Sequence, residues 1–198
     1  SMCLLYILLE LREVMKLSLT AVHVNHCIRG EEADEDEEYV RGICAGEGVE
    51  FLSFHEDVTG RARQQHLSLE EAGRLVRYEC FEKVRLMKNA DRIAVAHNMD
   101  DLCETVILNL ARGSGIKGMA GIPVKRGCIV RPLLRTGREE IEEFDRRKGI
   151  SFCTDRTNLE REYARNRIRL DVIPYLCENI NSRSREHIAE MAGFAEDL

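Results

Sequence analysis

The sequence has no hydrophobic run long enough to cross a membrane. Its longest early apolar run, Met2 to Leu9, is far shorter than the ~18 residues of a membrane helix. It also lacks the positive flank and the small-residue cleavage site of a signal peptide. We predict that this run forms an amphipathic helix in a soluble, cytoplasmic protein.

Paired cysteines are absent as well. The eight cysteines are scattered singly along 198 residues, with no C-x-x-C pair. This spacing does not suit the disulfide framework of a small secreted domain. Most of the cysteines lie among apolar residues, where cysteine packs as a small hydrophobe. The pattern predicts reduced thiols and argues against a structural zinc site.

A general excess of basic residues, typical of nucleic-acid-binding modules, is also missing, because the net charge is -6. The charge is uneven along the chain. Residues 1–100 carry 12 Lys and Arg against 19 Asp and Glu, whereas residues 101–198 carry 17 against 16. Any contact with RNA is therefore expected in the second half.

Short β-rich runs alternate with long helical patterns, which indicates βαβ units and a parallel sheet, so the predicted class is α/β. The expected strands are residues 17–25, 49–54, 92–96 and, more weakly, 128–130. The expected helices are 31–47, 69–87, a segment starting near residue 99, 138–148, 160–175 and a last stretch from 183. We divide the chain into an α/β domain, residues 1–155, and a helical extension, residues 156–198.

The stretch H-N-M-D-D-L-C-E-T, residues 97–105, follows an expected strand and begins an expected helix. Ligands bind at such strand ends in open α/β sheets. The apolar residues of the helix form a predicted buried stripe: Met99, Leu102, Cys103, Val106, Ile107 and Leu110. Asp100, Asp101 and Glu104 then share an exposed surface, where they can coordinate Mg²⁺ or hold an ammonium group. Alternatively, Asn98 caps the helix and the aspartates only favour its dipole.

Three other segments place polar residues where a ligand can be bound. Residues 21–34 contain His23, Asn25, His26 and Arg29 at a strand end. A helical segment, E-A-G-R-L-V-R-Y at 71–78, carries Arg74 and Arg77, whose planar charged groups suit phosphates. A third, R-N-R-I-R at 165–169, places Arg165 and Arg169 on one helix face and Arg167 on another. The alternatives are that His23 is a strand histidine, His26 lies in a loop and Arg29 is solvated, and that the other two segments are solvated helix faces.

The segment from Arg112 to Met119 is rich in glycine but lacks the G-K-[ST] of a Walker loop. We expect a mobile loop of about ten residues, with Arg112 and Lys117 on it. The alternative is that Gly113 only terminates the preceding helix.

Taken in order, these segments resemble the motifs of bacterial tRNA(Ile)-lysidine synthases, a family of the PP-loop ATP pyrophosphatases. The resemblance extends from Met2 to about Asn181 and includes D-R-T-N at 155–158, Tyr163 and I-P at 173–174. Residue Leu102 departs from the glutamine usual at that position. The implied fold is a Rossmann-like parallel sheet of the adenine nucleotide alpha hydrolase type.

The resemblance implies that ATP activates the C2 oxygen of a cytidine in the CAU anticodon of tRNA(Ile), and that L-lysine then displaces AMP. The implied cofactors are ATP and Mg²⁺. The implied catalytic residues are Asp100, Asp101, Glu104, Arg165 and Arg169, with Asp100 and Asp101 as magnesium ligands. The implied ATP-binding residues are Ser1, His23, Asn25, His26 and His97. The implied tRNA- or substrate-binding residues are Arg29, Arg74, Arg77, Arg112, Lys117 and Arg167.

The family's phosphate-binding loop, S-G-G-x-D-S, follows the first strand, whereas this sequence opens S-M-C-L-L. Ser1 is either the last serine of that loop or a remnant of an expression vector. We expect the central first strand to be absent from this chain, which would leave backbone groups of its neighbours unpaired. The chain then rearranges, self-associates, for example as a homodimer, or belongs to a longer polypeptide.

Two other functions fit parts of the pattern. A tRNA 2-thiolation enzyme shares the ATP chemistry but commonly uses paired cysteines, which are missing here. A non-catalytic fragment would retain only a surface that binds tRNA or protein.

Overall fold

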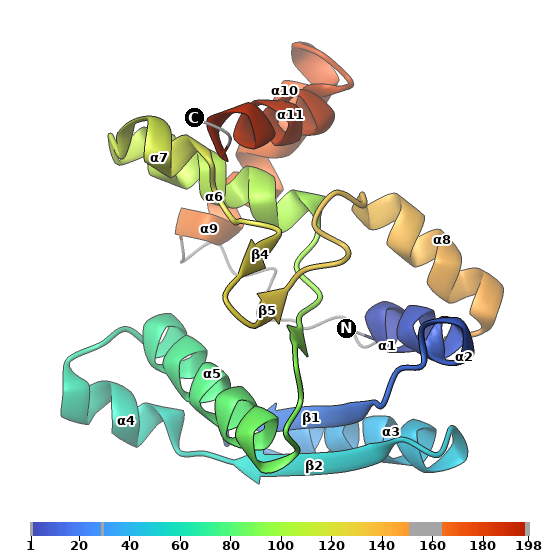
Figure 1. The fold of residues 1–198 in the computed structure, drawn as a ribbon. Coiled ribbons are helices and arrows are strands. Elements are labelled where there is room, and N and C mark those ends of the chain that lie inside the picture. The colour runs from blue at the N-terminus through green and yellow to red at the C-terminus, as the bar shows by residue number, and fades with distance from the viewer. Residues whose placement is uncertain (1, 29, 151–163, 197–198) are drawn as a thin grey trace. The chain divides into compact units, whose positions relative to one another are not determined.

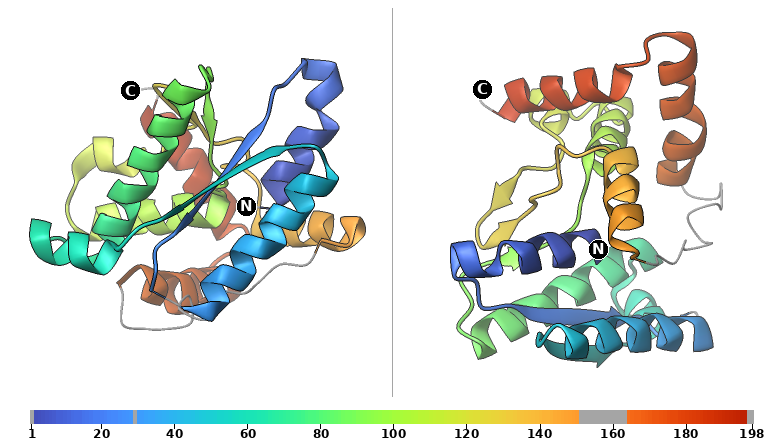
Figure 2. Two further views of the ribbon diagram at one scale, coloured as in Figure 1. Left: turned by 90° about the horizontal axis from the view of Figure 1, so that it is seen from below. Right: turned by 90° about the vertical axis from the view of Figure 1, so that its right-hand side faces the viewer.

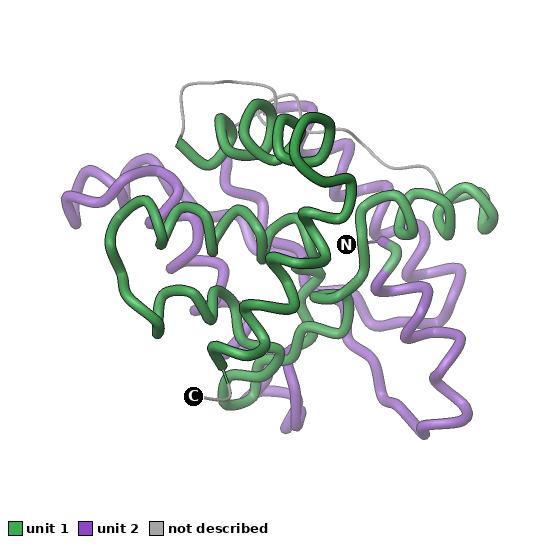
Figure 3. Tube along the Cα trace, turned by 90° about the horizontal axis from the view of Figure 1, so that it is seen from above, with its two compact units in different colours: residues 1, 3, 94–198 green, residues 2, 4–93 purple. Residues whose placement is uncertain are grey.

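The computed structural model describes residues 2–28, 30–150 and 164–196. The chain divides into two compact units (Figure 3). The N-terminal unit contains residues 2 and 4–93, and the C-terminal unit contains residues 1, 3 and 94–198. Ser1, Arg29, the motif at 155–158 and Tyr163 lie outside the described residues. The domain boundary predicted at residue 155 lies there too and stays a prediction.

The N-terminal unit alternates helices and strands as the sequence predicts (Figure 1). Its elements are α1 (Met2–Glu10), α2 (Arg12–Met15), β1 (Thr20–Asn25), α3 (Glu31–Gly46), β2 (Glu50–His55), α4 (Val58–Gln65) and α5 (Leu69–Met87). The helix predicted over the early apolar run is confirmed as α1. Helices α2 and α4 were not predicted, because each is short and α4 is polar in most positions.

Strands β1 and β2 form a parallel pair in which Thr20 lies opposite Glu50 and Asn25 opposite His55. Side chains of a strand alternate between its two faces. On one face, His23, Ser53 and His55 lie beside the buried Glu37 of α3. On the other face, Val24 and Phe54 pack against the core formed with α4 and α5. Helices α3 and α5 therefore cover opposite faces of the strand pair, which Figure 2 shows in two further views.

Helix α5 begins with a capping box in which Ser68 and Glu71 bond each other's backbone amides. The core that it shares with α4 contains Val58, Ala62, Ala72, Val76 and Cys80. The apolar residues that recur at helical spacing along α5 are thus buried in the middle of the helix. Its two ends are not, because Leu69 and Met87 are 41% and 58% exposed.

The C-terminal unit is built around α6 (Met99–Ala111). Its other helices are α7 (Gly115–Met119), α8 (Arg138–Lys148), α9 (Ala164–Arg167), the π-helical segment η2 (Ile168–Val172), α10 (Ile173–Asn179) and α11 (Ser184–Glu196). Its strands are β3 (Ile93–Ala94), which begins at the last residue of the N-terminal unit, β4 (Lys125–Arg126) and β5 (Ile129–Val130), in the sheet order β3-β5-β4. Strand β4 was not predicted, and its antiparallel pairing with β5 departs from an all-parallel sheet.

Helix α6 packs against the C-terminal helices through Leu102, Val106, Ala189 and Ala192, together with Leu134. Two predictions for this region are wrong. Leu110, placed in the buried stripe, is 63% exposed near the end of the helix. The glycine-rich segment contains helix α7 rather than only loop, and the Asn109 side chain donates to the carbonyl of Gly118 at 2.9 Å.

Across the described residues, no helix is both long and apolar enough to cross a membrane. All seven described cysteines are free thiols, as predicted, and four of them are buried.

Candidate active site

The start of α6 is fixed by Asn98. The Asn98 side chain accepts from the Asp101 amide at 3.1 Å, and the Asp101 carboxylate accepts from the Asn98 amide at 3.0 Å. This reciprocal pair is a capping box. The alternative interpretation, in which these side chains cap the helix, is therefore correct for Asn98 and for Oδ2 of Asp101. The other oxygen, Oδ1, faces two arginines.

Glu104 is the centre of a cluster of charged residues, which we call the arginine–carboxylate cluster: Asp100, Asp101, Glu104, Arg165, Arg169 and Arg185. We predicted Glu104 on an exposed surface, but its side chain is fully buried. Its carboxylate accepts from Nε of Arg165 at 2.9 Å, and from Nε and Nη2 of Arg169 at 2.5 and 3.0 Å. Burial of this carboxylate is tolerable because two guanidinium groups neutralise it.

Arg165 and Arg169 lie on one helical face, as predicted, and both reach Glu104. Burial alone would lower the pKa of Arg169, but its bonds to Glu104 and the charge of Asp101 outweigh burial and raise it. Asp101 Oδ1 is farther away, 3.8 Å from Arg165 and 3.6 Å from Arg169. The two arginines therefore hold the carboxylate of Asp101 less tightly than that of Glu104.

Asp100 points to a third arginine that the sequence analysis missed. Its Oδ1 accepts from Nε of Arg185, on α11, at 3.0 Å, and its Oδ2 accepts from the amide of Arg138 at 3.3 Å. Among the described residues, three arginines thus face three carboxylates. The sequence separation of 85 between Asp100 and Arg185 explains why no local sequence pattern reveals the pair.

The predicted magnesium ligands do not form a metal site by themselves. In the described part of the chain, no three His, Cys, Asp or Glu side chains gather as possible metal ligands. Asp100 and Asp101 are also engaged by Arg185 and Asn98. The arrangement does not fit a magnesium ion held by protein side chains alone.

His97 precedes the cap of α6 and contacts Arg131, another residue that sequence reasoning missed. Nε of Arg131 donates to Nδ1 of His97 at 3.2 Å. Arg131 follows the apolar residues of β5, and a charged residue directly after an apolar strand was the signal available in the sequence.

In the N-terminal unit, Asn25 is the last residue of β1 and His26 follows it. The buried Asn25 donates to Asp34 at 2.9 Å and accepts from the amide of Cys27 at 2.9 Å, so its side chain organises the loop between β1 and α3. The ring of His26 lies against Gly73 of α5, where a Cβ atom would be only 3.1 Å from Cε1. His23 is beside Phe51, with ring centroids 6.4 Å apart, on the α3 face.

Glu37 of α3 holds the polar residues of that face together. It accepts from Ser53 at 2.6 Å and forms a 2.8 Å ion pair with His55. Burial would raise the pKa of Glu37, but the bonds from Ser53 and His55 and the charge of His55 lower it below its usual range. The charge of His23 also lowers the pKa of Glu37, so His23 contributes to the electrostatics of this carboxylate.

The other predicted basic residues lie on surfaces. Arg74 stacks over the ring of Tyr78 at 5.2 Å. The exposed members are Arg77 on α5, Arg112 after α6, Lys117 on α7 and Arg167 on α9. None of them belongs to the arginine–carboxylate cluster.

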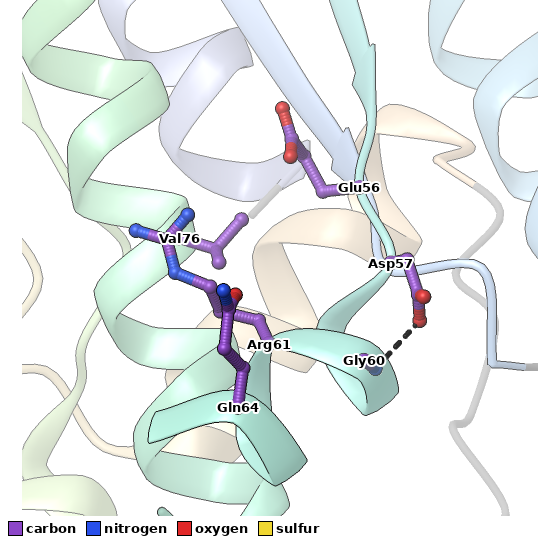
Figure 4. A pocket seen from close by; sticks show the side chains of 6 residues that line it. All are labelled: Glu56, Asp57, Gly60, Arg61, Gln64 and Val76. Atoms are coloured by element: carbon purple, nitrogen blue, oxygen red, sulfur yellow. Dashed lines mark hydrogen bonds between the residues drawn. The ribbon is translucent and has the colours of Figure 1, made fainter.

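A separate pocket of about 400 Å³ lies after β2, beside α4 and α5 (Figure 4). It is lined by Glu56, Asp57, Gly60, Arg61, Gln64 and Val76. Asp57 caps α4 through the amide of Gly60 at 2.8 Å, and Arg61 pairs with Glu79 at 2.9 Å. These polar groups serve the local fold, and no predicted site residue lines the pocket.

The close contact between Gly73 and His26 leads to a prediction. In a helix interior, Gly→Ala normally stabilises by about 1 kcal/mol. We expect Gly73→Ala to destabilise the chain instead, by about 1 kcal/mol, because the new methyl must push the His26 ring away. Gly42→Ala in α3 is the matched control, since nothing lies within 4 Å of its Cβ position. Urea unfolding of both variants, with the NMR signals of His26, measures the effect; equal stabilisation by both variants would contradict it.

Comparisons with known proteins agree with this architecture. The family model of the PP-loop domain matches residues 1–176. The chain is 45% identical over 182 residues to a tRNA(Ile)-lysidine synthase of Clostridium tetani, covering 91% of this chain and 39% of that protein. It is 43% identical over 192 residues to the tRNA(Ile)-lysidine synthase of Caldanaerobacter subterraneus subsp. tengcongensis, covering 97% and 41%. The chain thus spans about two fifths of the length of these curated relatives.

A solved structure shares the fold. The U34-tRNA thiolase NcsA from Methanococcus maripaludis, with its [4Fe-4S] cluster, superposes with a TM-score of 0.78 over 100% of this chain and 69% of that one. The sequence identity is 18%, so this likeness concerns the fold alone.

Proposed function

The chain belongs to the PP-loop domain family, and from that premise we propose that it provides the catalytic domain of a tRNA(Ile)-lysidine synthase. The observation that carries the proposal is the arginine–carboxylate cluster. All of its residues except Arg185 come from the two motifs that resemble this family most closely, at residues 97–105 and 165–169. The substrates are ATP, L-lysine and tRNA(Ile) with a CAU anticodon, and the reaction is cytoplasmic.

The proposed reaction has two steps. The cytidine C2 oxygen first bonds to the α-phosphorus of ATP, and pyrophosphate leaves with the electrons of the broken P–O bond. The lysine ε-amine then bonds to C2, loses a proton, and displaces AMP. The first step builds negative charge on phosphate oxygens, and the second needs an ammonium group held and deprotonated.

The cluster offers a group for each need. Asp101 Oδ1 would accept a hydrogen bond from the lysine ammonium, because it is the most loosely paired carboxylate oxygen and the Asp101 side chain is 22% exposed. Arg165 and Arg169 would bind phosphate oxygens or the lysine carboxylate through their forked donors. Glu104 holds these two arginines in place rather than contacting substrate.

His23, Asn25 and His26 in the N-terminal unit, and His97 in the C-terminal unit, remain proposed ATP-binding residues. Arg74, Arg77, Arg112, Lys117 and Arg167 remain proposed contacts to RNA. Mg²⁺ is expected with ATP, with Asp100 and Asp101 as the side chains to hold it. No step is assigned to the ion, since both carboxylates already bond other groups.

A tRNA 2-thiolation enzyme is the weaker alternative. The described cysteines are all free and four are buried, which does not suit a pair of reactive thiols.

Lysine transfer tests the proposal. The chain, and a version preceded by the family's S-G-G-x-D-S segment, is incubated with ATP, labelled lysine and a tRNA(Ile) transcript. We expect label in RNA only with ATP, and none with a transcript whose wobble cytidine is replaced by guanosine, which has no C2 oxygen. Asp101→Asn should lower transfer by about 100-fold or more, as loss of a group bound to the reacting amine does. Glu142→Gln, in an exposed pair with Arg138, is the control that retains activity.

Absence of lysine transfer by both versions, with intact tRNA binding, would support the non-catalytic alternative. Transfer of sulfur instead of lysine would support the thiolation alternative.

A further inference from the structure

Arg185 of α11 binds a different carboxylate from the other two arginines of the arginine–carboxylate cluster. Its Nε donates to Oδ1 of Asp100 at 3.0 Å. Arg165 and Arg169 both bond to Glu104. The side chain of Asp100 is only 15% exposed, so water and salt screen its charge weakly. Within the described part of the chain, Arg185 is therefore the cation placed directly on Asp100.

Both the side chain and the backbone of Arg185 are anchored. Its Nη1 donates to Sγ of Cys177 on α10 at 3.4 Å, and its carbonyl accepts from Sγ of Cys103 on α6 at 3.3 Å. Both cysteines belong to the apolar contact between α6, η2 and α10, in which Cys103 is fully buried. The guanidinium thus has a fixed place beside the start of α6. A long side chain that is already anchored loses little further conformational entropy when it binds Asp100.

The charge of Asp100 acts on an arginine that the proposed function assigns to the substrate. Burial lowers the pKa of Arg169, and its bonds to Glu104 raise it. The charges of Glu104, Asp101 and Asp100 raise it further. Asp100 therefore attracts Arg169. Without a cation of its own, the carboxylate of Asp100 would compete with a bound phosphate for Arg169 and would also repel that phosphate.

We propose that Arg185 is a positioning residue that occupies Asp100, so that Arg165 and Arg169 can direct their remaining donors to an anionic substrate. Arg185 acts through Asp100 and does not touch the substrate. The inference rests on the proposed function, in which ATP and lysine both bind at this cluster. Removal of the Arg185 charge should then weaken the binding of ATP and strengthen that of lysine, whose net charge is positive. An arginine that only stabilised the fold would change both affinities in the same direction.

NMR titrations test this opposition of signs. The ¹⁵N-labelled chain, and the version preceded by S-G-G-x-D-S, is titrated with a non-hydrolysable ATP analogue and separately with L-lysine, without Mg²⁺. We expect Arg185→Met to raise the dissociation constant of the analogue about fivefold and to lower that of lysine about twofold, as loss of one nearby, partly screened charge does. Arg185→Lys retains the charge and should change neither constant by more than about twofold. Both shifts should shrink at high salt, because the Arg185 side chain is 34% exposed.

Arg138→Met is the matched control. Arg138 lies beside Asp100 through its backbone amide, while its guanidinium pairs with Glu142 on the surface, so its loss should shift either constant by less than about twofold. The double variant Asp100→Asn with Arg185→Met removes the carboxylate together with its cation, and both constants should return to within about twofold of the unaltered chain. If Arg185→Met does not fold, Asp100→Asn is the mirror test, because it leaves the cation in excess. It should bind the analogue more tightly and lysine more weakly.

The outcomes separate this inference from the proposed function. Shifts of the same sign for both ligands, an equal effect of Arg138→Met, or no recovery in the double variant would overturn the role of Arg185, even where lysine transfer succeeds. If lysine transfer fails while the opposite shifts are observed, the function assigned to the domain is wrong but the role of Arg185 stands. If neither version of the chain binds either ligand, both proposals are wrong.

Discussion

Glu104→Gln should lower the free energy of unfolding by about 3 kcal/mol, the lower end of the range for breaking a buried ion pair. The change removes one charge from a cluster in which, within the described part of the chain, three carboxylates face three arginines. It leaves Arg165 and Arg169, whose side chains are each 24% exposed, facing an uncharged amide. Because water can still solvate these two guanidinium groups in part, the expected loss of stability lies at the lower end of that range. Urea unfolding followed by circular dichroism measures the change.

The control is Glu142→Gln, which breaks an ion pair between side chains 51% and 37% exposed and should cost at most about 0.5 kcal/mol. A second variant separates stability from function. Replacing Glu104, Arg165 and Arg169 together by Leu, Met and Met removes all three buried charges, so stability should recover to near that of the unaltered chain. Lysine transfer should still be lost. Equal stability of Glu104→Gln and Glu142→Gln would contradict the central position of Glu104.

The sequence predicted the features that depend on neighbouring residues. The start of α6 follows from Asn98 followed three residues later by Asp101, and the structure contains that capping box. The shared face of Arg165 and Arg169 follows from their spacing of four residues. Apart from the short helix α4, the alternation of strands and helices from residue 20 to residue 111 follows from the hydrophobic period, and the boundaries of the predicted elements differ by a few residues at most.

The features that depend on distant residues could not be predicted. Helical spacing placed Glu104 on a polar face, but only the fold shows that Arg165 and Arg169, more than 60 residues away, bury it. The same reason hid Arg185 and Arg131, whose partners are 85 and 34 residues away. The charged side chains that were predicted to bind ligands are therefore bonded to one another. A substrate that binds them must compete with these ion pairs.

These ion pairs should couple the binding of the lysine substrate to the binding of an anionic substrate. Each carboxylate of the cluster already has a cationic or backbone donor, so a lysine ammonium at Asp101 would compete with two arginines 3.6–3.8 Å away. An anionic substrate that attracts Arg165 or Arg169 would weaken this competition. Binding of phosphate and of lysine should consequently favour each other, with the coupling carried by the two arginines.

Cys103 should be resistant to alkylation while the chain is folded. Burial is the main cause that raises the pKa of its thiol to about 12, with the charge of Asp100 adding to the effect and Arg185 opposing it. At pH 8 the reactive thiolate is then on the order of 10³-fold scarcer than in an unfolded chain, whose cysteines have a pKa near ~8.5. Iodoacetamide labelling followed by mass spectrometry should modify the exposed Cys27 rapidly and Cys103 only in urea.

The same thiol links stability to pH, with a definite sign. Above about pH 9 the unfolded chain releases the Cys103 proton, while the folded chain retains it until pH approaches about 12. The folded state therefore loses stability as pH rises through this window, by up to ~1.4 kcal/mol per pH unit for this group. Cys103→Ala should flatten the dependence, whereas Cys27→Ala, on the surface, should leave it unchanged. Identical slopes in the two variants, or rapid labelling of Cys103 in the folded chain, would show that this thiol is not held in the apolar contact between α6, η2 and α10 that the structure describes.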